Sequence, residues 1–365
     1  MSNEVPLKQT PLYQQHLSLK AKMVPFGGWA MPVQYESIVA EYDCTRHACS
    51  LFDTSHMGEF FVDGDAVRSG LDFLVTQPIK DMPLKTCRYG VMLNEQGGII
   101  DDLIVFRIEQ ERWLIVVNAG TMEKDERQFQ KFIRPSEKFA NRSAEFGKLD
   151  IQGPQSRALL NGLIPDIGQL AYYAFDHFDL LGANVLVSRT GYTGELGYEI
   201  YFSWDRTPEL WDELLKRGAR PAGLGARDLL RIEMGYSLYG HELEENICPL
   251  DAGLERFIDW DKDFFGKTAL LKKKDSLDQQ KIICFISESR RSPRQHHRIY
   301  DQNQELIGEV TSGIFSPHFK QGVGLGFVKK ELAKKGDTIY FGDDKNKLPA
   351  EVVSRPIYKQ GSLKS

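Results

Sequence analysis

The stretch RYGVMLNEQGGIIDDLIVFRIEQERWLIVVN, residues 88–118, predicts the fold more clearly than any other part of the chain. Three of its segments are apolar and short enough to be single strands: Arg88–Leu93, Ile99–Ile108 and Arg112–Asn118. The residues between them, 94–98 and 109–111, are polar or glycine-rich, as turns are. We therefore expect an antiparallel meander, followed by a helix around Lys124–Phe132.

Two further patterns lie in the middle of the chain. Val185–Ser188 and Tyr198–Phe202 predict the arms of a hairpin whose loop is rich in glycine. Ala226–Met234 predicts a helix that follows Gly223-Leu224-Gly225, because its leucines and methionine have the spacing of one helix face.

The polar stretch KKKDSLDQQK, residues 272–281, predicts a linker between two domains. Residues 1–271 then form the first module, and residues 282–365 form a second. The second module contains short apolar segments separated by turns, which predicts an all-β barrel or sandwich. The expected strands are Ile282–Ser287, Glu305–Ser312, Gly322–Val328, Asp337–Phe341 and Ala350–Ser354.

Composition narrows the class of protein. The 365 residues have a net charge of −5, and lysines and arginines do not cluster, so we expect no nucleic-acid partner. No segment has the roughly 18 apolar residues of a membrane helix, and the N-terminus lacks the apolar core of a signal peptide. Five cysteines without a Cys-x-x-Cys pair favour reduced thiols in the cytoplasm and no bound metal.

The most informative polar residues are Asp101 and Asp102, inside the second strand of the meander. Neighbouring side chains of a strand point to opposite faces, so Asp102 shares its face with four apolar residues. A carboxylate on such a face is costly to bury without partners, which marks Asp102 as a functional candidate or as a cap at a strand end. Asp101 shares its face with Arg107, so we expect a cation close to it.

Glu199 and Arg227 are weaker candidates on pattern alone. Glu199 follows the glycine-rich loop, and an ordinary solvent-facing glutamate explains it equally well. Arg227 lies in the first turn of the predicted helix, where the helix dipole disfavours a cation. Its partner is then either a distant acid or the adjacent Asp228.

Motifs along the whole chain resemble the T protein of the glycine cleavage system. The most specific is GLGARDLLRIEMGYSLYGHELEENICPLDAGL at 223–254. The others occur in family order: Thr10–Tyr13, Lys22–Trp29, Met31-Pro32, Leu51–Met57, Gly97–Val105, Gln152–Pro154, Thr190–Glu195, Gly197–Ile200, Asp263–Lys267, Thr311–Gly313 and Phe315–Pro317. The chain departs from the pattern at Arg294–Ile299, where relatives often have Arg followed by Pro-Ile or Pro-Leu, so we assign Arg294 no ligand role.

The resemblance implies an α+β fold with three lobes around a central folate channel: two lobes before the linker and the C-terminal β module. It also implies an aminomethyltransferase. Lipoylated H protein would deliver an aminomethyl group, tetrahydrofolate would accept the one-carbon unit as a co-substrate, and ammonia would be released. No metal, nucleic acid or membrane takes part in such a reaction.

The resemblance also implies roles for individual residues. Asp102 matches the family aspartate that acts at folate N10. Glu199 matches the glutamate that accepts paired N–H donors from the pterin, for which a carboxylate is well suited. The other residues that match positions lining the folate site are Met57, Tyr89, Asn118, Tyr192 and Arg227.

Two alternatives share the scaffold. One is a folate-dependent demethylase that takes a methyl group from a small sulfonium or amine donor; the motif at 223–254 favours the T protein instead. The other is a non-catalytic folate-binding protein of iron–sulfur cluster assembly. Such relatives have a cysteine in a Lys-Gly-Cys-x-x-Gly-Gln-Glu signature, whereas this chain reads Arg189-Thr190-Gly191-Tyr192-Thr193-Gly194-Glu195.

Overall fold

Residues 87–117 form the predicted meander, and two more strands complete a five-stranded sheet in the order β6-β7-β8-β5-β9. Strand alternation sends Phe60 and Trp113 to one face, where they pack against Phe129 of a covering helix. This sheet with its two helices is the first lobe. Its elements are β5 (Gly58–Asp63), α3 (Leu71–Leu74), β6 (Cys87–Leu93), β7 (Ile99–Glu109), β8 (Arg112–Val117), α4 (Met122–Phe132) and β9 (Lys138–Asn141).

The predicted hairpin belongs to a six-stranded sheet, the second lobe, in the order β11-β12-β13-β10-β4-β14. Its core gathers around the fully buried Trp211 and Tyr198. The elements are β4 (Ser50–Asp53), η1 (Ser143–Glu145), β10 (Phe146–Gln152), α5 (Ser156–Asn161), η2 (Ile167–Gln169), β11 (Phe175–Leu180), β12 (Ala183–Ser188), β13 (Gly197–Ser203), η3 (Trp204–Arg206), α6 (Thr207–Lys216) and β14 (Arg220–Pro221).

Helix α7 (Leu224–Met234) begins two residues earlier than predicted, with Gly223 as its N-cap. A Cβ at Gly223 would lie 2.5 Å from the Val33 backbone, and one at Gly225 would lie 2.6 Å from Ile38, so only glycines allow this close approach. The neighbours of α7 include a three-stranded N-terminal sheet. These elements are β1 (Lys8–Gln9), α1 (Tyr13–Ser18), β2 (Lys22–Phe26), β3 (Trp29–Gln34) and α2 (Ile38–His47).

The C-terminal module is a closed barrel of six strands in the order β15-β18-β17-β16-β19-β20, which settles the choice between barrel and sandwich. The sequence predicts five of the strands and misses β16, whose three residues follow the polar pair His296-His297. The strands are β15 (Gln280–Ser287), β16 (Arg298–Tyr300), β17 (Leu306–Ser316), β18 (Gln321–Lys329), β19 (Thr338–Gly342) and β20 (Lys347–Val353).

The predicted linker at 272–281 is partly regular structure. Its first three residues end helix α8 (Lys267–Lys274), which η4 (Glu255–Phe257) precedes, and its last two begin β15. The computed structural model describes residues 6–276, 279–343 and 345–364, so residues 277–278 of this linker lie outside the described part. Among the described residues no helix is long and apolar enough to cross a membrane.

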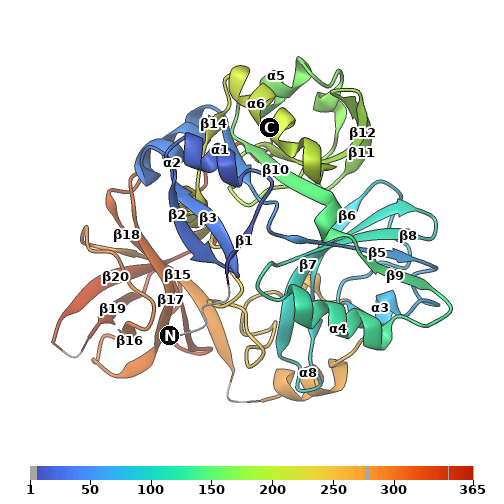
Figure 1. The fold of residues 1–365 in the computed structure, drawn as a ribbon. Coiled ribbons are helices and arrows are strands. Elements are labelled where there is room, and N and C mark those ends of the chain that lie inside the picture. The colour runs from blue at the N-terminus through green and yellow to red at the C-terminus, as the bar shows by residue number, and fades with distance from the viewer. Residues whose placement is uncertain (1–5, 277–278, 344, 365) are drawn as a thin grey trace.

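Figure 1 shows the predicted three lobes, with the barrel in orange and red. Buried hydrogen bonds attach the barrel to α7. Arg231 contacts Glu242 at 2.8 Å and donates to the Ser312 hydroxyl of β17 at 2.8 Å. The Ser316 hydroxyl donates to Glu233 at 2.6 Å, and Arg46 of α2 pairs with the same carboxylate at 2.6 Å. Helix α7 therefore holds the N-terminal elements and the barrel together.

Candidate active site

Asp102 is held on β7 by two donors from neighbouring strands of the first lobe. The Tyr89 hydroxyl donates to one carboxylate oxygen at 3.0 Å, and the Asn118 side-chain amide donates to the other at 2.7 Å. Asp102 is half-buried in the interior of its strand, so it does not cap a strand end. Burial and the neighbouring Asp101 charge raise the pKa of Asp102 to about 7, against the opposing effect of its two donors.

Asp101, which precedes Asp102 on β7 and points to the opposite face of the strand, is fully buried. It accepts hydrogen bonds from the Asn118 backbone at 3.0 Å and from the Asn118 side chain at 2.9 Å. Asp101 also contacts Asp125 of α4, which is equally buried. Burial, and after it the charge of Asp101, raises the pKa of Asp125 to about 10. A pKa of about 10 keeps Asp125 protonated at neutral pH, next to Asp101.

Among the described residues no cation forms an ion pair with Asp101, and Arg107 lies elsewhere. Its guanidinium donates to the Met82 and Gln110 carbonyls and packs over the Trp113 ring. The two residues share a strand face but are six residues apart, which is roughly 20 Å along a strand. Sharing a face therefore did not bring them into contact.

A second cluster lies in the second lobe, where β10 and β13 pair with Asp150 opposite Glu199. The ammonium group of Lys148 lies 2.8 Å from Asp150 and 2.8 Å from Glu199. Arg227 reaches the other oxygen of Asp150 at 2.8 Å, and the Thr190 hydroxyl donates to the second oxygen of Glu199. All of these charges except Arg227 are buried, so Glu199 is not the solvent-facing residue that its pattern allowed.

The charges of this second cluster compensate each other. Burial acts against it, but Lys148 and then Arg227 lower the pKa of Asp150 to about 2. Burial likewise acts against the Lys148 ammonium, yet Asp150 and Glu199 keep its pKa above the ordinary value. Burial raises the pKa of Glu199, and Lys148 opposes that effect. Asp150 and Lys148 therefore stay ionised at neutral pH.

Tyr192 lies between the two clusters. The guanidinium of Arg227 sits over the Tyr192 ring, 5.0 Å from its centroid, and Asp228 pairs with Arg231 instead of Arg227. Burial raises the pKa of Tyr192, and the charge of Asp102 adds to this effect. Met57 completes the second cluster, with its sulfur 3.9 Å from the Lys148 ammonium group.

The seven residues expected at the folate site therefore fall into two groups. Three are in the first lobe and four surround the second-lobe cluster, with Tyr192 within electrostatic reach of Asp102 and Tyr89. Six of them are half-buried and Glu199 is buried. Their roles stay predictions, as does the central channel.

The sequence pattern did not single out Lys148 and Asp150. The strand FGKLDIQ alternates polar and apolar residues, which is typical of a strand with one solvated face. The only feature that could have indicated a buried ion pair is the placement of two opposite charges two residues apart on that face. His56 is also buried here; desolvation lowers its pKa to about 4, and its Nδ1 atom has no partner among the described residues.

Comparison with known families decides what the chain is. The family model for the GCVT N-terminal domain matches residues 12–262, and the model for the glycine cleavage T-protein C-terminal barrel domain matches residues 280–359. This chain belongs to the glycine cleavage T-protein family. Residues 263–279 lie between the two matches and include most of the expected linker.

Individual relatives agree with this family along their full lengths. An aminomethyltransferase from Pseudothermotoga lettingae is 42% identical over 98% of this chain and 100% of its own. One from Halothermothrix orenii is 41% identical over 96% of this chain and 100% of its own. The crystal structure of the glycine cleavage system aminomethyltransferase T from Bartonella henselae superposes with a TM-score of 0.87, at 30% identity, over 97% and 99% of the two chains.

Proposed function

We propose that this chain is the aminomethyltransferase of the glycine cleavage system, with lipoylated H protein as donor and tetrahydrofolate as acceptor. The family and its full-length relatives support the transferase activity. The observation that supports the site is the position of Tyr192, which lies under Arg227 of the second-lobe cluster and within electrostatic reach of Asp102 of the first lobe. One cluster handles a proton near neutral pH, and the other presents fixed charges.

The transfer balances without an oxidant. The donor carbon lies between the lipoyl sulfur and an amine. Its bond to sulfur breaks and leaves a thiol, its bond to the amine breaks and leaves ammonia, and it forms two new bonds, to folate N5 and N10. The protons that N5 and N10 lose are the two that the thiol and ammonia gain. A proton carrier at N10 is therefore the main chemical requirement.

Asp102 meets that requirement. Its pKa of about 7 means that it gains and loses a proton readily at neutral pH, which is the best condition for a group that shuttles one. The Tyr89 and Asn118 donors fix its orientation, so that an approaching N10 meets a positioned carboxyl group.

The second cluster suits the pterin. Each oxygen of Glu199 has one donor, from Lys148 and Thr190, and retains a lone pair for a ring N–H. The unpartnered Nδ1 of His56, close to the charges of Lys148 and Asp150, is a further polar atom that a ligand would satisfy. The residues present therefore fit a flat heterocycle with paired donors. Lys148 would hold Glu199 in place for it.

The test compares two donors at matched concentration: H protein whose lipoyl arm holds the aminomethyl group, and free aminomethyl-lipoamide. Formation of methylenetetrahydrofolate is followed with each. We expect the protein-borne donor to react far faster, because docking positions the arm. Equal rates would show that docking contributes nothing. If neither donor reacts while a small methylated amine or sulfonium does, the chain is a demethylase instead.

A further inference from the structure

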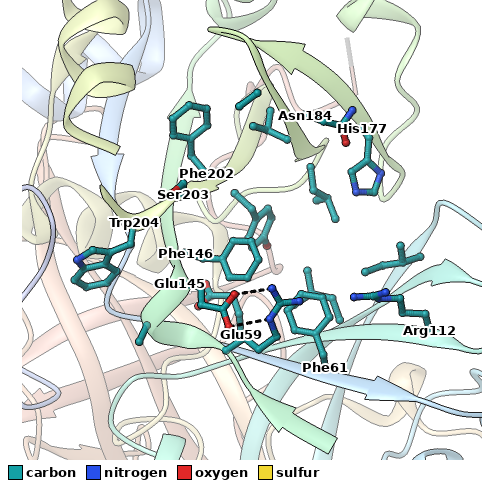
Figure 2. Close-up of a pocket in the computed structure, with 18 of the residues that line it drawn as sticks. Glu59, Phe61, Arg112, Glu145, Phe146, His177, Asn184, Phe202, Ser203 and Trp204 are labelled. Atoms are coloured by element: carbon teal, nitrogen blue, oxygen red, sulfur yellow. Dashed lines mark hydrogen bonds and ion pairs between the residues drawn. The ribbon is translucent and has the colours of Figure 1, made fainter. Parts of the chain in front are cut away.

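The loop between β12 and β13, residues 189–196, contributes two residues to the candidate site. Tyr192 lies between the two acid clusters, and the Thr190 hydroxyl donates to a carboxylate of the second. At the opposite, open end of this hairpin, Asn184 and Phe202 line a pocket of about 860 Å³ between the first and second lobes (Figure 2). The position of the loop therefore depends on contacts at its own end of the hairpin.

The chain returns to this loop after it leaves the barrel. Strand β20 ends at Val353, and the backbone amides of Ile357 and Tyr358 then donate to the Glu233 carbonyl near the end of α7, each at 2.9 Å. Residues 361–363, which we call the tail segment, reach the loop from there. The tail segment thus connects the barrel and α7 with the second lobe.

Hydrogen bonds join the tail segment to three consecutive loop residues. The amide and the hydroxyl of Ser362 both donate to Oε2 of Glu195, at 2.8 Å and 2.6 Å. The Leu196 amide donates to the Ser362 hydroxyl at 3.0 Å, and the Leu363 amide donates to the Gly194 carbonyl at 3.2 Å. Ser362 therefore acts both as donor and as acceptor in this contact.

Glu195 depends on the tail segment because it is buried. Its side chain is 2% exposed, and its other carboxylate oxygen pairs with Arg46 at 2.7 Å. The same guanidinium group donates to the Thr193 carbonyl at 2.8 Å, so Arg46 and Ser362 hold the loop from two directions. Among the described residues Ser362 is the only donor to Oε2 of Glu195. A buried carboxylate oxygen that loses its donor is unfavourable, so loss of this contact would favour movement of the loop toward water.

Gly361 meets a steric requirement of the same contact. A Cβ atom at this position would lie 2.2 Å from the Gly194 carbonyl oxygen, which is closer than Cβ atoms come to a backbone atom. Only glycine lets the tail backbone approach the loop this closely. The contact can therefore be disturbed by two independent changes, one steric and one polar.

We propose that Ser362 is a positioning residue for tetrahydrofolate: through Glu195 it holds the loop of Tyr192 and Thr190 in the conformation that receives the pterin. Without this contact the loop populates other conformations, and the apparent affinity for folate falls by the fraction that stays competent. Saturating folate restores the ordered loop, so the chemical step keeps its rate. This inference rests on the proposed function, which places Tyr192 and Glu199 at the folate.

The test compares three variants by steady-state kinetics and by calorimetry with tetrahydrofolate. Ser362→Ala removes the hydroxyl, and Gly361→Ala forces the tail backbone away from the loop. We expect each to weaken folate binding about tenfold and to raise the KM for folate equally, with kcat unchanged. Ser362→Thr keeps the hydroxyl and should restore wild-type values. Ser18→Ala, on an exposed serine of α1, is the control and should match wild type.

Hydrogen exchange shows whether the loop is the part that changes. Without folate, residues 189–196 should exchange faster in Ser362→Ala and Gly361→Ala, and bound folate should slow them to the wild-type rate.

Three results would overturn the positioning role while wild type binds folate. They are unchanged folate affinity in both alanine variants, unchanged loop exchange, and a fall in kcat at constant KM, which a loss of folded enzyme would produce. If wild type binds no tetrahydrofolate, the proposed function fails and this inference fails with it.

Discussion

The two acid clusters of the candidate active site both contain buried aspartates, but the pKa of Asp102 is raised and that of Asp150 is lowered. In the first lobe, Asp101, Asp102 and Asp125 have no cation in contact among the described residues, and the pKa of Asp102 rises to about 7. In the second lobe, Lys148 and Arg227 flank Asp150 and lower its pKa to about 2. Burial alone disfavours the charged form in both places.

The difference lies in what each cluster provides against burial. The donors of Asp102 are uncharged and its neighbour is another acid, so Asp102 can change its protonation state near neutral pH, as proton transfer requires. Opposite charges hold Asp150 ionised throughout the physiological range, as a fixed recognition surface requires. The role of a buried acid therefore depends on the charged and hydrogen-bonding groups that surround it.

The largest effect should come from Asp102→Asn, which leaves the shape and removes the proton carrier. We expect turnover to fall by about 10²–10⁴-fold, the usual contribution of general acid–base catalysis. Steady-state assays with loaded H protein measure it, and circular dichroism checks the fold. Asp101→Asn is the comparison and should be milder. Equal losses in the two variants would remove the distinction between these neighbours.

Replacing Lys148 should damage stability more than replacing an acid of the first lobe. Lys148→Met leaves Asp150 and Glu199 buried with too little positive charge, which should cost about 3–5 kcal/mol in urea unfolding. Asp125→Asn is the matched test of the other cluster. Folded Asp125 keeps a proton that the unfolded chain loses at neutral pH, so we expect Asp125→Asn to cause no loss of stability at pH 7 and to raise it instead. Similar losses from both would mean that Asp125 is charged.

The pH dependence of stability should differ in sign between these two aspartates. Asp150 contributes stability that is present above the ordinary Asp pKa of about 3.9 and is lost as pH falls toward 2. Asp125 contributes stability that is present below that value and is lost as pH rises toward about 10. Asp125→Asn should therefore flatten the alkaline side of the stability profile. An unchanged alkaline slope would contradict the raised pKa of Asp125.

A smaller effect is expected from Glu199→Gln, on folate binding. One acceptor oxygen becomes a donor that faces a pterin N–H, which should cost about 1.5–3 kcal/mol, or roughly ten- to hundredfold in affinity. Calorimetry with tetrahydrofolate measures it. The affinity of wild type should also fall as pH drops through the raised pKa of Glu199. Wild-type affinity in the variant would move Glu199 out of the binding site.

The smallest effect should be the shift that Asp101→Asn causes in the pH–rate profile. Wild-type turnover should fall as pH drops through about 7, when Asp102 becomes protonated. Removing the Asp101 charge lowers the proton affinity of Asp102, so the midpoint should move about one unit toward acid. A midpoint that stays in place would show that burial alone sets the pKa of Asp102.

The sequence by itself determined the local structure and the family. Alternating apolar residues and glycine turns predicted the meander, the hairpin and five strands of the barrel, because a strand's period can be read without knowing its partners. Motifs in family order identified the glycine cleavage T-protein family, which the family models confirm. The three-residue strand β16 was too short to show any period.

Only the tertiary structure decided which charges meet. The pattern around Lys148 and Asp150 is typical of the solvated face of a strand. In the structure these two side chains are buried, because Glu199, 51 residues after Lys148, contacts Lys148 and Arg227 contacts Asp150. Arg107 shared a face with Asp101 and was still too distant to neutralise it, whereas Asp125, on a helix, was in contact. Electrostatic roles depend on distance in space and on burial, and neither is encoded in the spacing of residues along one strand.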